Sequence, residues 1–343
     1  MDEQKHQSQK SIFPWFIEEF FNYKDFTERT KDIYKTDFIF FFNWLSNQNL
    51  CNHDLSYITL EELDKLTLKE IKLYKKYLET YKDVSKKNKS FSQTTIARKL
   101  SVLSSLFHYL ANVAVFSNDN PYLQNNWFYF IKKNDNRKSP HIKAKYLTDE
   151  ILITLDELYE FRDFVSNEYH NTLDSDRQLI YYNKNRLRDT AIISLFLFSG
   201  IRLNELVNLE LDDLYLHKRF LIIKSENGIE RKITLFEDAV KDLENYLYTR
   251  KQLNSPFSNV FLSKYNNEYS KMSVRAIQVL ITKYSKSFYK TDLSAQKLRH
   301  SFSTVLFAST NNIFELQREL GQETVNPVLV YTKLYNKKDN KLC

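Results

Sequence analysis

The stretch Ser294-Ala-Gln-Lys-Leu-Arg-His-Ser-Phe-Ser-Thr304 places an arginine beside a histidine, Arg299 and His300, at the start of an amphipathic run. Its apolar residues recur at the spacing of one helix face: Phe302, Val305 and Leu306. A Leu-Gly pair follows, and then a tyrosine, Tyr331. Arginine can grip a phosphate with two parallel hydrogen bonds, and a tyrosine hydroxyl can form a covalent phosphoryl intermediate. The stretch therefore predicts phosphoryl transfer onto a tyrosine.

Composition limits the class of protein. A chain of 343 residues is long enough for two domains, and its net charge of +7 favours a polyanionic partner, although a similar surplus occurs in proteins that bind none. The polar start and the absence of a long apolar run predict neither a signal peptide nor a membrane span. Cys51 and Cys343 lie far apart in unlike contexts, which argues against a disulfide or a metal site and favours a reducing cytoplasm.

The first part of the chain, 12–130, reads as mostly helical, with aromatic stripes that predict a core. Its clearest helix starts near Ser90, with an apolar face of Ile96, Leu100, Leu103, Phe107 and Leu110. The segment 132–147 is basic and contains a proline, so it reads as a linker. Beyond it, 214–223 and 232–236 are strand-like, and Asn227-Gly228 between them is a hairpin signal.

Four ordered motifs resemble the signature of the tyrosine recombinases, that is, the phage integrases and Xer proteins. They are Ser199-Gly-Ile-Arg-Leu-Asn-Glu-Leu, Gln296-Lys-Leu-Arg-His, Leu320-Gly-Gln and Tyr331. Tyr331 follows Gln322 by nine residues, which is the interval of the family signature. The resemblance covers nearly the whole chain and is strongest to the single-recombinase Xer branch. It implies a mainly α fold with a small β-sheet: a helical SAM-like core-binding domain (1–131), the basic linker (132–147) and an α+β catalytic domain (148–343).

The resemblance also implies the chemistry. Tyr331 would be the nucleophile that forms a 3′-phosphotyrosyl linkage, and Arg202 and Arg299 would hold the non-bridging oxygens. Two guanidinium groups then replace the cation of many nucleases, so neither a metal nor a cofactor is expected. The simpler alternatives are that Arg202 forms a surface ion pair with Glu205 and that Arg299 is only a helix-face charge. Tyr335, one helical turn later, is the competing nucleophile.

The chain departs from the family pattern at three positions. Glu226 aligns with the general-acid lysine of the family's hairpin, so Lys224, two residues earlier, is our candidate and Lys232 is the second. Gln296 and Gln322 stand where the family has histidine or, at the second position, also tryptophan. Glutamine donates hydrogen bonds but cannot exchange a proton, which costs general acid–base catalysis typically ~10²–10⁴-fold in rate. His300 is a partial substitute. We expect a slow recombinase.

By resemblance, the polar side of the helix near Ser90 contacts double-stranded DNA through Thr94, Arg98 and Lys99, with a solvated surface as the alternative. Lys297 is a further candidate contact. The resemblance implies that four copies of the chain assemble as a tetramer on two DNA duplexes. A DNA translocase is a possible further partner. The role is chromosome dimer resolution or movement of a genetic element. A catalytically attenuated DNA-binding relative is the main alternative, and the Xer-like first half argues against a type IB topoisomerase.

Overall fold

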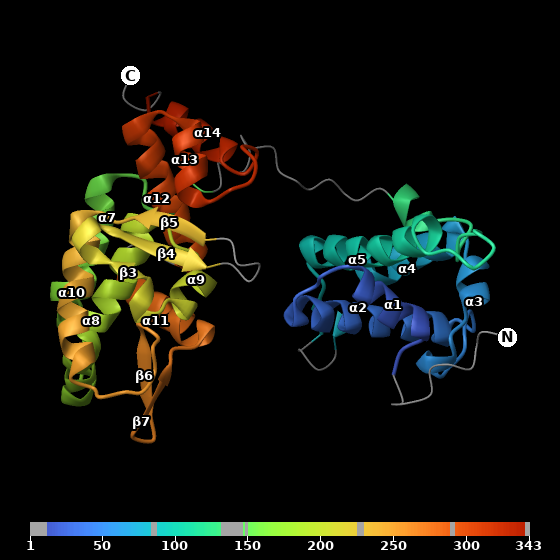
Figure 1. Cartoon of the computed structure of the whole chain (residues 1–343), viewed down its shortest axis with the longest axis horizontal. Coiled ribbons are helices and arrows are strands. Elements are labelled where there is room, and N and C mark those ends of the chain that lie inside the picture. The colour runs from blue at the N-terminus through green and yellow to red at the C-terminus, as the bar shows by residue number, and fades with distance from the viewer. Residues whose placement is uncertain are drawn as a thin grey trace. The chain divides into compact units, whose positions relative to one another are not determined.

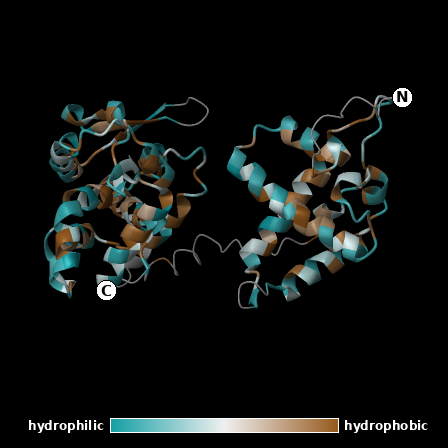
Figure 2. Cartoon of the chain, turned by 90° about the horizontal axis from the view of Figure 1, so that it is seen from below, coloured by the Kyte–Doolittle hydropathy of each residue, from teal (hydrophilic) through white to brown (hydrophobic). Residues whose placement is uncertain are grey.

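The structure, a computed structural model, describes residues 12–83, 88–131, 147, 150–224, 230–288 and 292–339, the last five of these by backbone alone. Contacts divide the chain into two compact units, Met1–Arg137 and Lys138–Cys343 (Figure 1). The predicted linker lies outside the described residues except for Leu147, and so does the turn at Asn227-Gly228. Within each unit the hydrophobic residues gather on the inward faces of the helices (Figure 2).

The first unit is helical. Its main helices are α1 (Trp15–Tyr23), α2 (Glu28–Asn47), α3 (Leu60–Asp64), α4 (Leu68–Thr80) and α5 (Gln93–Asn112), with a short β1–β2 pair (Lys82–Asp83 and Lys89–Ser90) before α5. Thr67 and Glu70 form a reciprocal capping box, which starts α4 where the Thr-x-x-Glu pattern predicts. The aromatic stripes form the core, as expected: Phe16, Phe20, Phe38, Phe41, Phe42, Phe107 and Phe128 are almost fully buried.

Lys99 does not lie on the surface of α5. Its side chain is 6% exposed, its ammonium is 2.8 Å from a carboxylate oxygen of Asp37 on α2, and it also lies over the rings of Phe40 and Phe91. Asp37 is itself 1% exposed, so the two charges neutralise each other inside the unit. The prediction that Lys99 contacts DNA is therefore corrected: this lysine is a buried structural partner.

The two other candidates on α5 are exposed. Thr94 and Arg98 lie four residues apart and so share one face of the helix. The guanidinium of Arg98 binds both oxygens of Asp37, yet its side chain remains 43% exposed. Because Lys99 already balances the carboxylate, Arg98 presents an uncompensated positive charge at a fixed position.

Replacing Asp37 by asparagine should strongly destabilise the first unit. The change leaves the buried ammonium of Lys99 without its counter-charge, and breaking such a pair costs about 3–5 kcal/mol. All three tryptophans, Trp15, Trp44 and Trp127, belong to this unit, so their fluorescence during urea unfolding of the full chain reports on it. Glu28→Gln, which breaks a solvent-exposed pair with Lys31 on the same helix, is the control and should leave the midpoint in place. Equal urea midpoints for Asp37→Asn and Glu28→Gln would contradict the structural role of the buried Lys99–Asp37 pair.

The second unit is built around α8 (Asp176–Ser199), whose last eleven residues, 189–199, are all buried. This helix packs against α10 (Glu237–Lys251), α12 (Ala295–Thr310) and α7 (Leu155–Asp163). A π-helical turn, Phe164–Glu168, follows α7. The remaining described α-helices are α9 (Leu203–Asn208), α11 (Val274–Ser287), α13 (Ile313–Leu320) and α14 (Leu329–Asp339).

A three-stranded antiparallel sheet lies beside these helices, in the order β3 (Leu214–Tyr215), β4 (Phe220–Lys224) and β5 (Glu230–Thr234). Leu221 pairs with Ile233, and both are buried. A second hairpin, β6 (Leu262–Tyr265) with β7 (Glu268–Lys271), was not predicted. Its turn residues, Asn266 and Asn267, both have positive φ, as a tight hairpin turn requires.

Candidate active site

Arg202 stands at the junction of two helices. α8 ends at Gly200, which has φ +61°, and Arg202 then caps the start of α9. Its backbone N–H and its Nη1 donate to Glu205 at 2.8 Å each, and its Nη2 donates to the carbonyl of Gly321 at 2.9 Å. The ion pair with Glu205 considered as a simple alternative is thus present. It is one of two anchors, because the second bond ties Arg202 to a turn 119 residues away.

Arg299 is buried on α12, with 4% of its surface exposed. Its guanidinium donates to the carbonyl of Gly200 and, at 2.6 Å, to the carbonyl of Leu320. Burial, and then the positive charge of Arg202, lower the pKa of Arg299 to about 10. The guanidinium groups of Arg299 and Arg202 bind the consecutive carbonyls of Leu320 and Gly321, so they lie close together, as one shared phosphate ligand would require. Arg299 is therefore not a solvated helix-face charge.

Tyr331 is buried on α14, and its hydroxyl is 2.6 Å from Nδ1 of His300. Burial raises the pKa of the phenol, while a hydrogen bond with Ser303 and the charge of Arg299 act in the opposite direction. Tyr331 of α14 thus lies beside the adjacent residues Arg299 and His300 of α12. Tyr335 belongs to the residues described by backbone alone.

The two glutamines occupy different surroundings. Nε2 of Gln296 is 3.2 Å from Nε2 of His300, so the amide and Tyr331 flank the imidazole on opposite sides. A carboxamide next to one ring nitrogen influences which nitrogen carries the proton. The backbone carbonyl of Gln322 accepts a hydrogen bond from Gln317 at 3.0 Å, which closes the end of α13.

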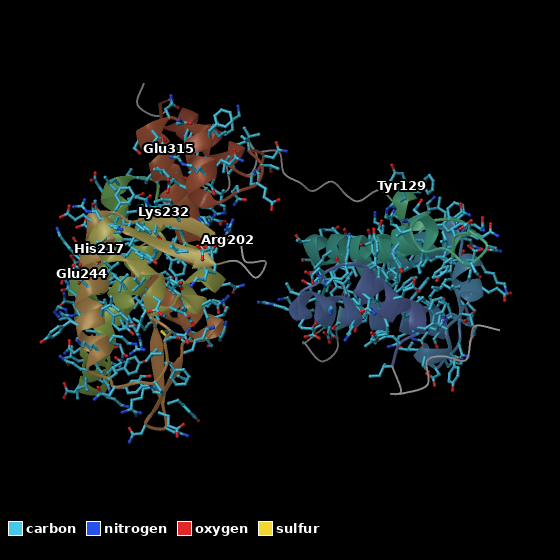
Figure 3. The ribbon with its side chains drawn as sticks, viewed as in Figure 1. Tyr129, Arg202, His217, Lys232, Glu244 and Glu315 are labelled. Carbon is cyan, nitrogen blue, oxygen red and sulfur yellow. The ribbon has the colours of Figure 1, made fainter. Side chains whose placement is uncertain are left out.

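The structure does not bring the lysine candidates to the arginines. Lys224 pairs with Asp213 at 2.7 Å, and hydrogen bonding and charge from that carboxylate raise its pKa. Lys232 lies over the ring of Phe220, with its ammonium 4.1 Å from the ring centre. Strand pairing sets both lysines on the face of the sheet opposite to Arg231 (Figure 3 labels Lys232 and Arg202). Glu226 lies outside the described residues, and the identity of the general acid stays a prediction.

A hollow opens beside the two arginines. Its lining is rich in polar groups, and it consists of Arg202, Leu203, Arg275, Gln278, Thr282, Ser294, Ala295, Gln296 and Arg299. Sequence reasoning missed Arg275 and Gln278. A signal exists, because Arg275 follows the capping Ser273 in the first turn of α11, where the helix dipole disfavours a cation. Lys297, the remaining candidate, pairs with Glu150 at 3.3 Å.

Among the described residues, no group of three or more His, Cys, Asp or Glu side chains is arranged to hold a metal ion. The same part of the chain contains no helix of the length and hydropathy that spanning a bilayer requires. The polar groups that the structure brings together at the site are guanidinium, imidazole, phenol and amide groups.

Comparison with known proteins gives the family. Residues 164–338 match the phage integrase family. Tyrosine recombinase XerS of Streptococcus thermophilus (strain CNRZ 1066) is 30% identical over 342 residues, which cover 97% of this chain and 95% of the relative. The chain belongs to the tyrosine recombinases of the phage integrase family. Tyrosine recombinase XerS of Streptococcus mutans is 31% identical over 339 residues, 95% of this chain and 94% of the relative.

Solved tyrosine recombinases share the fold. XerH bound to its difH substrate, in a pre-cleavage complex, has a TM-score of 0.61 at 18% identity and covers 92% of this chain and 80% of that one. The Tn1549 transposon integrase in complex with transposon right end DNA has a TM-score of 0.59 at 18% identity, covering 95% and 98%. The predicted family, fold class and enzyme class are confirmed: this chain is a DNA strand-exchange enzyme of the tyrosine type.

Gly200→Ala should destabilise the second unit. A Cβ would lie 2.4 Å from the ring of Phe302, and the left-handed backbone costs an L-residue about 1–2 kcal/mol by itself. Adding Phe302→Leu removes the obstructing ring, so the double variant should be less destabilised than the sum of the single variants. Urea unfolding followed by circular dichroism, with tryptophan fluorescence to identify the first unit, measures this. Additive losses would show that the ring contact is unimportant.

Proposed function

We propose that this recombinase cuts a specific DNA site with Tyr331, which forms a 3′-phosphotyrosyl linkage, and that Arg202 and Arg299 hold the scissile phosphate. The observation that carries the proposal is the convergence of these groups. Arg202 and Arg299 bind the consecutive carbonyls of Gly321 and Leu320, and the charge of Arg299 acts on the hydroxyl of Tyr331. Preorganised cations beside the point where charge develops are the main source of rate in phosphoryl transfer.

The proposal includes the following electron and proton movements. The phenolic oxygen of Tyr331 forms a bond to phosphorus as the bond from phosphorus to the 5′-oxygen breaks. The phenol's proton passes to Nδ1 of His300, which lies at hydrogen-bond distance and accepts it in the tautomer that carries the ring's own proton on Nε2. The departing 5′-oxygen takes a proton from a lysine of the β4–β5 hairpin, for which Lys224 remains our candidate and Lys232 the second. Attack by a second 5′-hydroxyl reverses the steps and releases the tyrosine.

The first unit would add binding to the duplex. We assign the exposed face of α5 with Thr94 and Arg98 to DNA contact, since each phosphate neutralised by a fixed cation releases counterions. In the second unit, Arg275 and Gln278 line the same hollow as Arg202 and Arg299. The domain limits 1–131, 132–147 and 148–343 belong to this proposal. So do a tetramer on two duplexes, a DNA translocase partner and a cytoplasmic place of action.

A second candidate function is site-specific DNA binding with little or no cleavage. The observation in its favour is that glutamine stands at both positions, Gln296 and Gln322, where the family has histidine or, at the second position, also tryptophan. The two readings agree on the DNA partner and differ only in turnover. The biological role, chromosome dimer resolution or movement of a genetic element, is common to both.

A nicked suicide substrate should trap the intermediate. The duplex site is first selected from random sequences and mapped by footprinting, and a nick near the cleavage point then prevents religation. The wild-type chain should form a covalent adduct that Tyr331→Phe abolishes while binding is retained. If the adduct forms and peptide mapping places it on another residue, the assignment of Tyr331 fails. Binding without any adduct supports the second candidate function.

His300→Gln should slow the formation of that adduct by ~10²–10⁴-fold, because the phenol loses its proton acceptor. The amide can still hydrogen-bond, so affinity for the site should persist. His217→Gln removes an exposed histidine of the same unit and serves as the matched control (Figure 3). Single-turnover cleavage rates compare the two variants. Equal cleavage rates for His300→Gln and His217→Gln would show that the proton of Tyr331 passes to an acceptor other than His300.

A further inference from the structure

Arg231 on β5 joins three segments that surround the proposed phosphate site. Its Nη2 donates to both carboxylate oxygens of Glu205, at 2.8 and 2.7 Å, and its Nη1 donates to the carbonyl of Glu319 at 2.9 Å. The side chain is 17% exposed. Nothing in the proposed chemistry uses this arginine directly. Its partners lie 26 and 88 residues away, so it closes contacts between the sheet, α9 and the end of α13.

Glu205 is shared between two arginines. Besides Arg231, it accepts from the backbone N–H and from Nη1 of Arg202. Burial by itself would raise the pKa of this carboxyl, but the charge of Arg231 and the bonds from Arg202 outweigh it and hold the pKa below its usual value. The carboxylate is therefore charged and sits between two cations. The three side chains together carry one net positive charge.

The end of α13 receives three arginines in a row. The carbonyl of Glu319 accepts from Arg231, that of Leu320 from Arg299, and that of Gly321 from Arg202. The preceding carbonyls, of Gln317 and Arg318, are taken by backbone N–H groups of the same turn. These carbonyls form the negative end of the helix, which favours cations. The turn thus sets the spacing of all three guanidinium groups.

The aliphatic part of the Arg231 side chain leaves room only for a glycine at position 321. A Cβ on this glycine would lie 2.3 Å from Cδ of Arg231, and its φ of +57° is a left-handed conformation. The arginine therefore passes directly against the backbone that carries the acceptor for Arg202. A displacement of Arg231 would move that acceptor as well.

We propose that Arg231 is a positioning residue for the phosphate grip: it balances Glu205 and fixes the turn, so that Arg202 keeps its positive charge for the DNA phosphate. The inference rests on the proposed function of Arg202. Without Arg231, Glu205 has Arg202 as its remaining cation among these three side chains. The pair would then be neutral, and the carboxylate would compete with the phosphate for the same N–H groups.

The first test compares Arg231→Gln with Arg231→Lys. On the suicide substrate, Arg231→Gln should cleave ~10²-fold more slowly, since small displacements of a positioning group cost rates of this order. Affinity for the site should be unchanged. Lysine restores the charge but not the planar fork, so Arg231→Lys should fall between glutamine and wild type. Arg219→Gln breaks a surface pair with Glu237 in the same unit and is the matched control, expected within about fivefold of wild type.

The decisive readout is a charge rescue. Adding Glu205→Gln to Arg231→Gln removes the competing carboxylate, so the double variant should cleave faster than Arg231→Gln alone. A merely structural role predicts the reverse, because a second buried bond is lost. A substrate with a 5′-bridging sulfur, whose leaving group needs no acid, should not restore the Arg231→Gln rate. If this substrate restored the cleavage rate of Arg231→Gln, the substitution would have impaired protonation of the leaving group by the hairpin lysine, and the proposal would be wrong.

The outcomes separate the two claims. A wild-type chain that binds its site and forms no adduct through Tyr331 contradicts the proposed function. If wild type forms the adduct and Arg231→Gln cleaves at the control's rate, the positioning role is contradicted while the function stands. Thermal unfolding of every variant shows whether a slower cleavage rate is caused by unfolding. If Arg231→Gln is unfolded, the cleavage rate of Arg231→Lys, which keeps the charge, is compared with that of wild type instead.

Discussion

The site depends on the carboxyl end of one short helix. α13 ends at Gly321, and the last carbonyl groups of that end point at Arg231, Arg299 and Arg202 in succession. Helix ends leave such carbonyls without backbone partners, and a buried end without partners would be costly. Three guanidinium groups satisfy them, and in return the helix end offsets part of the repulsion between like charges. The hydrogen bonds that hold the three guanidinium groups in place are therefore also bonds that stabilise the fold.

The two described glycines serve this arrangement. Each ends a helix in the left-handed conformation, and each presents its carbonyl to an arginine: Gly200 to Arg299, and Gly321 to Arg202. Each also faces a large side chain, Phe302 or Arg231, that leaves no room for a Cβ. In a chain with only three glycines, the need for open backbone at these turns explains why two remain there.

Local signals in the sequence predicted much of the fold. The aromatic stripes form the core of the first unit, and the strands on either side of the Asn-Gly signal pair as β4 and β5. The predicted strand 214–223 is divided into β3 and β4 by the turn Leu216–Lys218. The ordered motifs also singled out Arg202, Arg299 and Tyr331. The two arginines hold consecutive carbonyls, and Tyr331 lies beside Arg299 and His300. Lys99 was misassigned because its partner, Asp37, lies 62 residues away, and helical periodicity puts it at the border of the polar face. Arg231 escaped notice for the same reason, since long-range partners leave no periodic signal.

The satisfied arginines have a consequence for the protein between encounters with DNA. Arg299 and Arg202 each already hold two acceptors, and the phenol of Tyr331 rests on His300. An idle enzyme with bare buried cations would attract any small anion and strain its own fold. In the proposed function, these resting contacts would occupy the place of the DNA phosphate, so Tyr331 would stay positioned but unreactive until a duplex binds.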